Sequence, residues 1–140
     1  MEKVFVDTNI ILDWLGQRQP YFQYAKELFK KAEDKKVEIF ISTMSFISTE
    51  YILSKQIGKE QAKQALAAIR TITRVCQSGE KEIDLSLVSK MKDFEDSFQY
   101  YNALNNSADV IITRNPKDFQ GSAIPVMNAE EYIKMKSSMP

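Results

Sequence analysis

The chain contains no histidine and a single cysteine, Cys76, among its 140 residues. The lack of histidine excludes Ser-His-Asp triads, Cys-His pairs and histidine proton shuttles. A lone cysteine cannot form a disulfide framework, and without histidine it cannot complete the usual zinc sites. A reactive centre in this chain must therefore use carboxylates, hydroxyls and amides, whose oxygens suit a hard metal ion.

An excess of charge of one sign is also missing, because 19 Lys and Arg residues balance 19 Asp and Glu residues. Zero net charge argues against a protein held on nucleic acid by a broad basic surface, although a nuclease can meet phosphates with metal ions and local cations. No Gly-rich phosphate loop occurs, which disfavours a Walker-type nucleotide-binding protein. No signal-type run and no apolar stretch of membrane-spanning length is seen, so we expect a cytoplasmic protein that does not enter a membrane.

What the sequence does contain is an alternation of short β-branched runs with segments of helical periodicity. The predicted strands are residues 3–7, 37–42, 72–76, 109–113 and 124–127. The first predicted helix ends at residue 15, and the second runs from residue 20 to about 34. Further helices are predicted over 43–57 and 59–70, from residue 84 or 86 to 91, over 94–104, and after a cap at Asn128. Strands joined by helices imply crossover connections, which predicts a three-layer α/β/α fold with a mostly parallel central sheet. No linker divides the chain, so we predict one domain over residues 1–140.

Four acidic side chains lie in positions where carboxylates can carry chemistry. Asp7 ends the first predicted strand, Glu50 lies within the helix over residues 43–57, Asp96 lies near the start of the helix over 94–104, and Asp118 follows the strand DVIIT. Open α/β sheets bind ligands at the carboxyl ends of their strands, and a buried carboxylate needs a cation or a wet cleft. Such acids, if they converge, would hold one or two Mg²⁺ ions, which polarise a phosphodiester and acidify a bound water.

Each of these acids also has a purely structural interpretation. Asp7 fits the cap of a following turn, and Glu50 fits a partly exposed helix acid. Asp96 suits the positive end of its helix, and Asp118 suits a turn. Taken singly, each acid leaves both interpretations open.

Polar residues beside these acids are candidates for contact with a substrate, namely Asn9, Thr113, Arg114 and Asn115. Thr113 would orient a water or a phosphate, Asn115 would serve as a polar ligand or donor, and Arg114 would meet a backbone phosphate. The alternatives are an ordinary β-branched strand residue for Thr113, an Asn-Pro turn for Asn115 and a surface ion pair for Arg114.

The sequence resembles the PIN domain (PilT N-terminal-like) family over nearly its whole length. The resemblance rests on the order of Asp7-Thr8-Asn9, Glu50 in the third helix, Asp96 in FEDSFQYYNAL, and then IITRNPKDF. It is most similar to the small bacterial PIN proteins that act as ribonuclease toxins in VapBC-type toxin–antitoxin pairs. That likeness implies a parallel sheet with flanking helices, dependence on Mg²⁺ or Mn²⁺, hydrolysis of RNA, a homodimer and a small antitoxin partner.

Carried over by position, the resemblance makes Asp7 and Asp96 the principal metal ligands. Glu50 would complete the pocket or help to activate water. The fourth acidic position of the family matches Asn115, with Asp118 three residues later, so the fourth ligand stays open between them. Thr113 matches a hydroxyl position of the family.

The sequence therefore predicts a metal-dependent endoribonuclease, the toxin of a type II toxin–antitoxin pair. The alternative is a catalytically weak or inactive PIN-like module that binds RNA or protein, which Asn115 favours because it brings no charge to the fourth position. A flavodoxin-like phosphoacceptor domain fits poorly, because the first strand offers one acid and the strand VEIFIS ends in Ser42.

Overall fold

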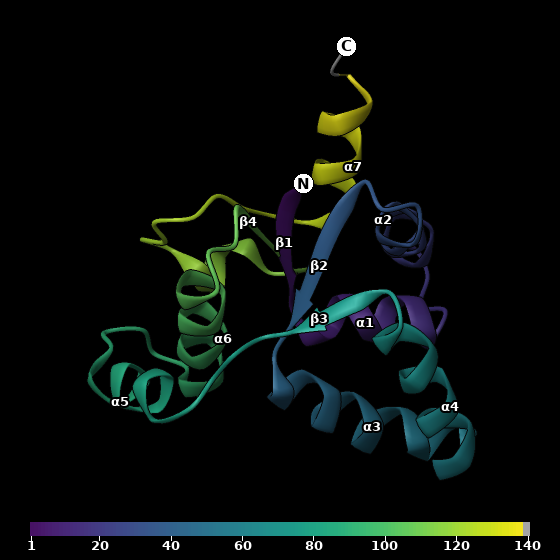
Figure 1. The fold of residues 1–140 in the computed structure, drawn as a ribbon, viewed down its shortest axis with the longest axis horizontal. Coiled ribbons are helices and arrows are strands. Elements are labelled where there is room, and N and C mark those ends of the chain that lie inside the picture. Colours follow the sequence, from purple (N-terminus) through teal and green to yellow (C-terminus); the bar gives the residue numbers. More distant parts are fainter. Residues whose placement is uncertain (139–140) are drawn as a thin grey trace.

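The computed structural model describes residues 1–138 and contains a five-stranded, all-parallel sheet in the order β3-β2-β1-β4-β5 (Figure 1). The strands are β1 (Glu2–Val6), β2 (Val37–Ile41), β3 (Thr73–Val75), β4 (Val110–Ile112) and β5 (Val126–Met127). The five strands predicted from the sequence are confirmed, and β5, which directly follows Pro125, lies at a sheet edge, where proline is tolerated.

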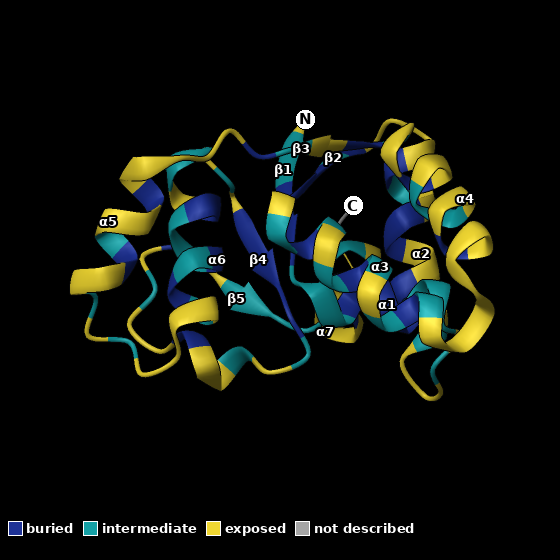
Figure 2. Ribbon diagram, turned by 90° about the horizontal axis from the view of Figure 1, so that it is seen from below, coloured by how far each residue is buried: buried dark blue, intermediate teal, exposed yellow. Residues whose placement is uncertain are grey.

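Helices cover both faces of the sheet, which confirms the predicted three-layer α/β/α architecture. The helices are α1 (Thr8–Leu15), α2 (Phe22–Glu33), α3 (Thr43–Ile57), α4 (Lys59–Arg70), α5 (Glu80–Val88), α6 (Phe94–Asn105) and α7 (Ala129–Ser137), with a short 3-10 helix η1 (Pro116–Phe119). Figure 2 shows α5 and α6 on one side of the sheet and α1, α2, α3, α4 and α7 on the opposite side. No helix within residues 1–138 is long and apolar enough to span a membrane.

The central strand β1 is apolar on both sides because each side faces a core. Val4 and Val6 belong to the cluster that includes Leu28 of α2 and Tyr132 of α7. Phe5, which points the other way, belongs to the cluster with Ala103 of α6. Alternate strand residues face opposite sides of a sheet, so a strand between two helical layers has a continuous apolar run.

The strands β1 and β4 run in parallel and end at the same level of the sheet. Val6 pairs with Ile112, and the next residue, Asp7, donates its backbone N–H to Ile112 O at 2.9 Å. The residues that follow the two strands, Asp7 and Thr113, therefore emerge side by side. This is the edge at which open parallel sheets form their ligand sites.

Local capping explains where the structure departs from the predicted helix ends. Helix α5 begins at Glu80, before the predicted Asp84 or Ser86, because Glu82 Oε1 accepts the N–H of Gly79 at 2.8 Å and fixes the first turn. It ends at Val88, before the predicted residue 91, because Ser89 is extended. Helix α1 is capped by Asp7, whose side chain accepts the N–H of the next residue, in keeping with the structural interpretation of this acid.

The fold predicts a large difference between two chemically identical truncations. Ile111→Ala should lower the free energy of unfolding by about 2–5 kcal/mol, because Ile111 is fully buried in the cluster beneath α6. Ile47→Ala, at a side chain that is 73% exposed, should change it by less than about 0.5 kcal/mol. Urea unfolding of both variants measures the difference, and equal losses would contradict the placement of the core.

Candidate active site

The Asp7 carboxylate is held through both of its oxygens at the end of β1. Oδ1 accepts the backbone N–H of Thr8 at 2.8 Å and the side-chain amide of Gln99 at 3.0 Å. Oδ2 accepts the hydroxyl of Thr113 at 2.9 Å. Donors from α1, α6 and the end of β4 thus fix the orientation of this one carboxylate.

Gln99 connects this carboxylate to the other helices around it. Its amide nitrogen also donates to Ser45 Oγ at 2.8 Å, and Ser45 Oγ shares a hydrogen bond of 2.7 Å with Thr8 Oγ1. The network therefore ties α6, α3 and α1 together behind Asp7. The amide oxygen of Gln99 is buried at the wall of the cavity described next and has no hydrogen-bond partner within residues 1–138.

Asp7 opens onto a cavity of about 240 Å³, whose polar lining includes side chains of α6 and of the segment that follows β4. Asp96 comes from the first turn of α6, and Asn115 and Asp118 come from the segment that follows β4. Asp7, Asp96, Asn115 and Asp118, which are far apart in the sequence, thus share one hollow. The sequence left the fourth position open between Asn115 and Asp118, and both side chains line the cavity.

The mutual repulsion of these acids is visible in Asp96. Partial burial, and then the negative charges of Asp93, Asp7, Asp118 and Glu95, raise its pKa from 3.8 to about 6. A raised pKa means that the negative charge of this carboxylate is destabilised by its surroundings. A cation bound nearby would stabilise that charge.

Glu50 does not reach the cavity, which corrects the prediction that it joins Asp7 and Asp96 there. Helix α3 contributes Met44 to the cavity wall, and Glu50 lies six residues later. At about 100° per residue, the two side chains are separated by about 120° around the helix axis. Glu50 is therefore on the opposite border of the buried stripe formed by Ser45, Thr49 and Leu53.

Two residues predicted to contact substrate instead hold other groups in place. Thr113 is fully buried and donates its hydroxyl to Asp7, so it positions the carboxylate. Asn9 lines the cavity, and its side-chain oxygen accepts the N–H of Arg114 at 3.1 Å. Asn9 therefore anchors α1 to the segment that follows β4.

Arg114 is paired with an acid that the sequence analysis missed. Its Nε and Nη2 atoms donate to the two oxygens of Asp13, a side chain in α1 that is 1% exposed, and its guanidinium lies 4.2 Å from the ring centre of Tyr21. This pair satisfies the buried Asp13 and removes Arg114 from the set of free cations. Asp13, Gln99 and Ser45 had no signal beyond helical spacing: Asp13 follows Asn9 by one turn, and Gln99 follows Asp96 by three residues.

The donors of the cavity fit a hard divalent cation held partly by water. Within residues 1–138, no three acidic, cysteine or histidine side chains come together closely enough to surround an ion. Mg²⁺ is commonly held by one or two carboxylates and several waters at oxygen ligands. Asp7 and Asp96 are the carboxylates of the cavity that would hold such an ion.

Comparison with known proteins places this arrangement among relatives. A family model described as PIN domain matches residues 3–117. The chain is 28% identical over 138 residues to Ribonuclease VapC1 of Aquifex aeolicus (strain VF5), covering 95% of this chain and 94% of that protein.

Solved structures share the fold. A toxin–antitoxin complex from Klebsiella pneumoniae superposes with a TM-score of 0.68 at 22% identity, covering 90% of this chain and 97% of that one. The VapBC2 structure from Rickettsia felis, bound to a DNA fragment from its promoter, gives a TM-score of 0.66 at 18% identity, with the same coverage of 90% and 97%.

The raised pKa of Asp96 predicts how stability depends on pH. The folded protein binds the proton of Asp96 more tightly than the unfolded chain, so the contribution of Asp96 to the free energy of unfolding decreases as pH rises from 3.8 to about 6. Asp96→Asn removes that ionisation and should raise the melting temperature above pH 6 in metal-free buffer, with a gain that vanishes below about pH 4.

Scanning calorimetry from pH 3.5 to 8 measures this gain. Asp84→Asn, at an exposed acid of α5 that does not line the cavity, is the matched control and should show no such pH-dependent gain. A gain for Asp96→Asn that stays the same at every pH would contradict the assignment.

Proposed function

Because the chain belongs to the PIN domain family, we propose that its acidic cavity hydrolyses RNA phosphodiesters as a divalent-metal-dependent endoribonuclease, the toxin of a type II toxin–antitoxin pair. The observation that carries the proposal is the position of Asp7, fixed by donors from three elements at the end of β1 and sharing a cavity with Asp96 and Asp118. The name of the Aquifex aeolicus relative, Ribonuclease VapC1, supports RNA as the substrate.

Asp7 and Asp96 would hold Mg²⁺ or Mn²⁺, with Asn115 as a neutral oxygen donor. When bound, such an ion offsets the charge of the phosphate and makes a nearby water more acidic. Thr113 and Gln99 keep the Asp7 oxygens in place throughout, so that little reorganisation accompanies the reaction. Asp118, which is exposed and lines the cavity, would take a proton from the attacking water as the water oxygen bonds to phosphorus. The bond from phosphorus to the leaving oxygen breaks, and the leaving oxygen gains a proton from solvent.

A small antitoxin partner is proposed on the same ground. Solved structures that share the fold include a toxin–antitoxin complex from Klebsiella pneumoniae and VapBC complexes from other bacteria. The homodimer, the cytoplasmic location and the single domain over residues 1–140 stay predictions from the sequence.

Substitution of the two principal acids should abolish cleavage and preserve the fold. Asp7→Asn keeps the oxygen that accepts from the N–H of Thr8, and its new amide N–H can donate to Thr113 Oγ1. Asp7→Asn and Asp96→Asn should each lower the rate of Mg²⁺- or Mn²⁺-dependent RNA cleavage by more than about 100-fold, the upper loss typical of residues that merely support metal ligands.

Rates are measured on a labelled single-stranded RNA, with circular dichroism to confirm folding. Asp84→Asn again serves as the control and should retain the rate of the unaltered protein. Undiminished cleavage by the doubly substituted Asp7→Asn/Asp96→Asn protein would refute the proposal.

The alternative function is a PIN-like module that binds RNA or protein without cleaving. Asn115 in the cavity favours it, because an amide in place of a carboxylate weakens the attraction for a cation. Direct measurement of metal binding separates the two functions, since only the nuclease requires a bound ion.

Calorimetric titration with Mn²⁺ should show binding that depends on the hydroxyl of Thr113. Thr113→Val removes the donor to Asp7 Oδ2 and should weaken Mn²⁺ binding by about 10–100-fold, as the loss of supporting hydrogen bonds does at other metal sites. Thr113→Ser keeps the hydroxyl and should bind nearly as the unaltered protein does. Absence of Mn²⁺ binding by the unaltered protein, with and without RNA, would favour the alternative.

A further inference from the structure

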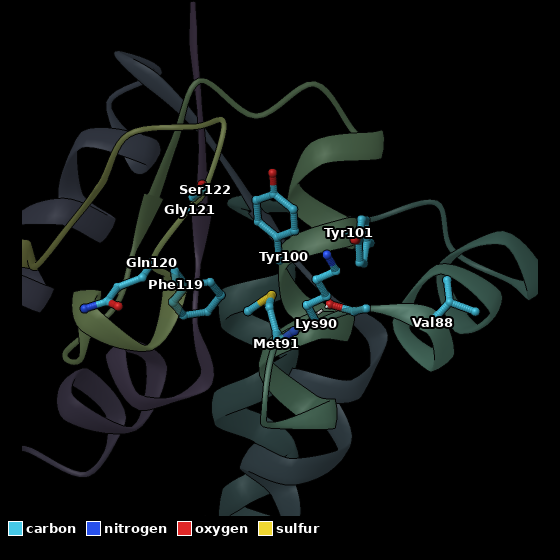
Figure 3. Close-up of a pocket in the computed structure, with 10 residues that line it drawn as sticks. Val88, Lys90, Met91, Tyr100, Tyr101, Phe119, Gln120, Gly121 and Ser122 are labelled. Carbon is cyan, nitrogen blue, oxygen red and sulfur yellow. Dashed lines mark hydrogen bonds between the residues drawn. The ribbon is translucent and has the colours of Figure 1, made fainter.

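The acidic cavity is one end of a longer groove. Asp96 and Asp118 also line a second hollow, whose other lining residues are Lys90, Met91, Lys92, Asp93, Lys117 and Gln120. We call this part the lysine stretch. Lys90 in turn lines a third hollow beneath α6, the Tyr100 pocket, which is bounded by Met91, Tyr100, Tyr101, Phe119 and Gln120 (Figure 3). Because each hollow shares side chains with the next, the three adjoin in a row that starts at the acids, and we call this row the groove.

The lysine stretch supplies three cations that no carboxylate of residues 1–138 holds in an ion pair. Lys90, Lys92 and Lys117 are exposed, and none of them forms an ion pair within the described residues 1–138. They lie beside acids in a chain whose net charge is zero. Ammonium groups left free next to a site for a phosphodiester are complementary to the neighbouring phosphates of the same strand.

The Tyr100 pocket has the walls that a nucleobase needs. It encloses about 380 Å³, within the range of small-ligand sites. The Tyr100 hydroxyl accepts the N–H of Ala123 at 3.1 Å, which fixes the ring, and Tyr101 lies edge-on to it with ring centres 5.1 Å apart. Met91 and Phe119 complete an apolar wall that continues the core. Rigid aromatic and apolar walls bind a base by stacking and exclude water from its faces.

We propose that this groove binds the RNA strand on one side of the bond that is cut, an inference that rests on the proposed function. Lys90, Lys92 and Lys117 contact the phosphates, and the Tyr100 pocket receives an unpaired base. The base must be unpaired because both faces of a paired base are covered by its neighbours in the helix. The groove thus restricts cleavage to single strands and loops, and the pocket walls select the nucleotide.

The opposite flank of the acidic cavity is less suited to this role. The hollow on that side, reached past Asn115, is lined by Asp13, Tyr21 and Arg114. Its cation already pairs with the buried Asp13 and stacks on Tyr21. The lysine stretch offers three unpaired cations, and charge complementarity therefore places the strand on its side.

A matched pair of variants tests the contact with phosphates in the full-length Asp7→Asn/Asp96→Asn protein, which should bind RNA without cutting it. The groove variant adds Lys90→Ala, Lys92→Ala and Lys117→Ala. The control variant instead adds Lys36→Ala, Lys59→Ala and Lys63→Ala, which lowers the net charge equally at exposed lysines that line none of the three hollows.

Fluorescence anisotropy with a labelled single-stranded RNA measures the affinity at several salt concentrations. The groove variant should bind at least about tenfold more weakly, and the slope of log K against log salt should fall by about 2, as three lost phosphate contacts to a single strand predict. The control variant should keep both values, and a duplex of the same sequence should bind more weakly than the single strand. Equal behaviour of the two variants would overturn the proposal.

Photo-crosslinking locates the base. RNA carrying 4-thiouridine at successive positions should crosslink to Met91, Tyr100 or Tyr101, identified by mass spectrometry of the digested protein. Crosslinks at Tyr21 or Tyr24 instead would place the strand on the opposite flank and overturn the proposal.

Cleavage assays with the acids intact distinguish failure of the groove from failure of the function. Cleavage by the unaltered protein together with equal rates for the two lysine variants would overturn the groove alone. Absence of cleavage together with groove-dependent RNA binding would overturn the hydrolysis and support the groove. RNA binding and cleavage unchanged in the groove variant, but with inhibition by a co-purified antitoxin lost, would assign the groove to the protein partner and overturn the proposal.

Discussion

The parallel pairing of β1 with β4 is the constraint on which the site depends. The hydrogen bond from the N–H of Asp7 to Ile112 O extends this pair to the last residue of both strands. The chain then turns away in two directions at one edge of the sheet, and the hydroxyl of Thr113 reaches Asp7 Oδ2 across the gap between the strands. A shift of one residue in this pairing would turn Asp7 toward the opposite face and separate the two groups.

The site accumulates negative charge in a chain whose net charge is zero. Asp96 reflects this, because its partial burial, and then the negative charges around it, raise its pKa to about 6. Asp13, in contrast, is almost fully buried but meets the guanidinium of Arg114 through both oxygens. The buried structural acid, Asp13, is therefore paired with a cation. The acids that face the cavity are left to repel one another. Such local cost is the expected signature of a binding site.

The fold followed from the sequence because its signals are local. Apolar runs such as VEIFIS, the cap at Ser42 and the glycine at position 58 determine strand and helix bounds within a few residues. The grouping of Asp7 with Asp96 was also accessible, since strand ends and helix starts meet at one sheet edge. The placement of Glu50 was not, because its position depends on how α3 is rotated about its own axis, and spacing within one helix does not reveal the direction of its neighbours. Gln99 and Asp13 were missed for the same reason, since their roles exist only across elements.

Helix α6 carries three functions within about one turn. Because the three side chains lie on one helix, their relative positions are fixed. Asp96 faces the acids, Gln99 holds Asp7 from behind, and Tyr100 forms the wall of the neighbouring pocket. A displacement of this helix along its axis would disturb all three together, so the distance between the acids and the pocket is effectively locked. Diversification among relatives of this protein would then have to act through the two loops that border the pocket, at Met91 and Gln120, where side chains can be exchanged without moving the helix. In this architecture, the helix fixes the spacing between the acids and the pocket along the substrate. The loops can change which nucleotide the pocket prefers.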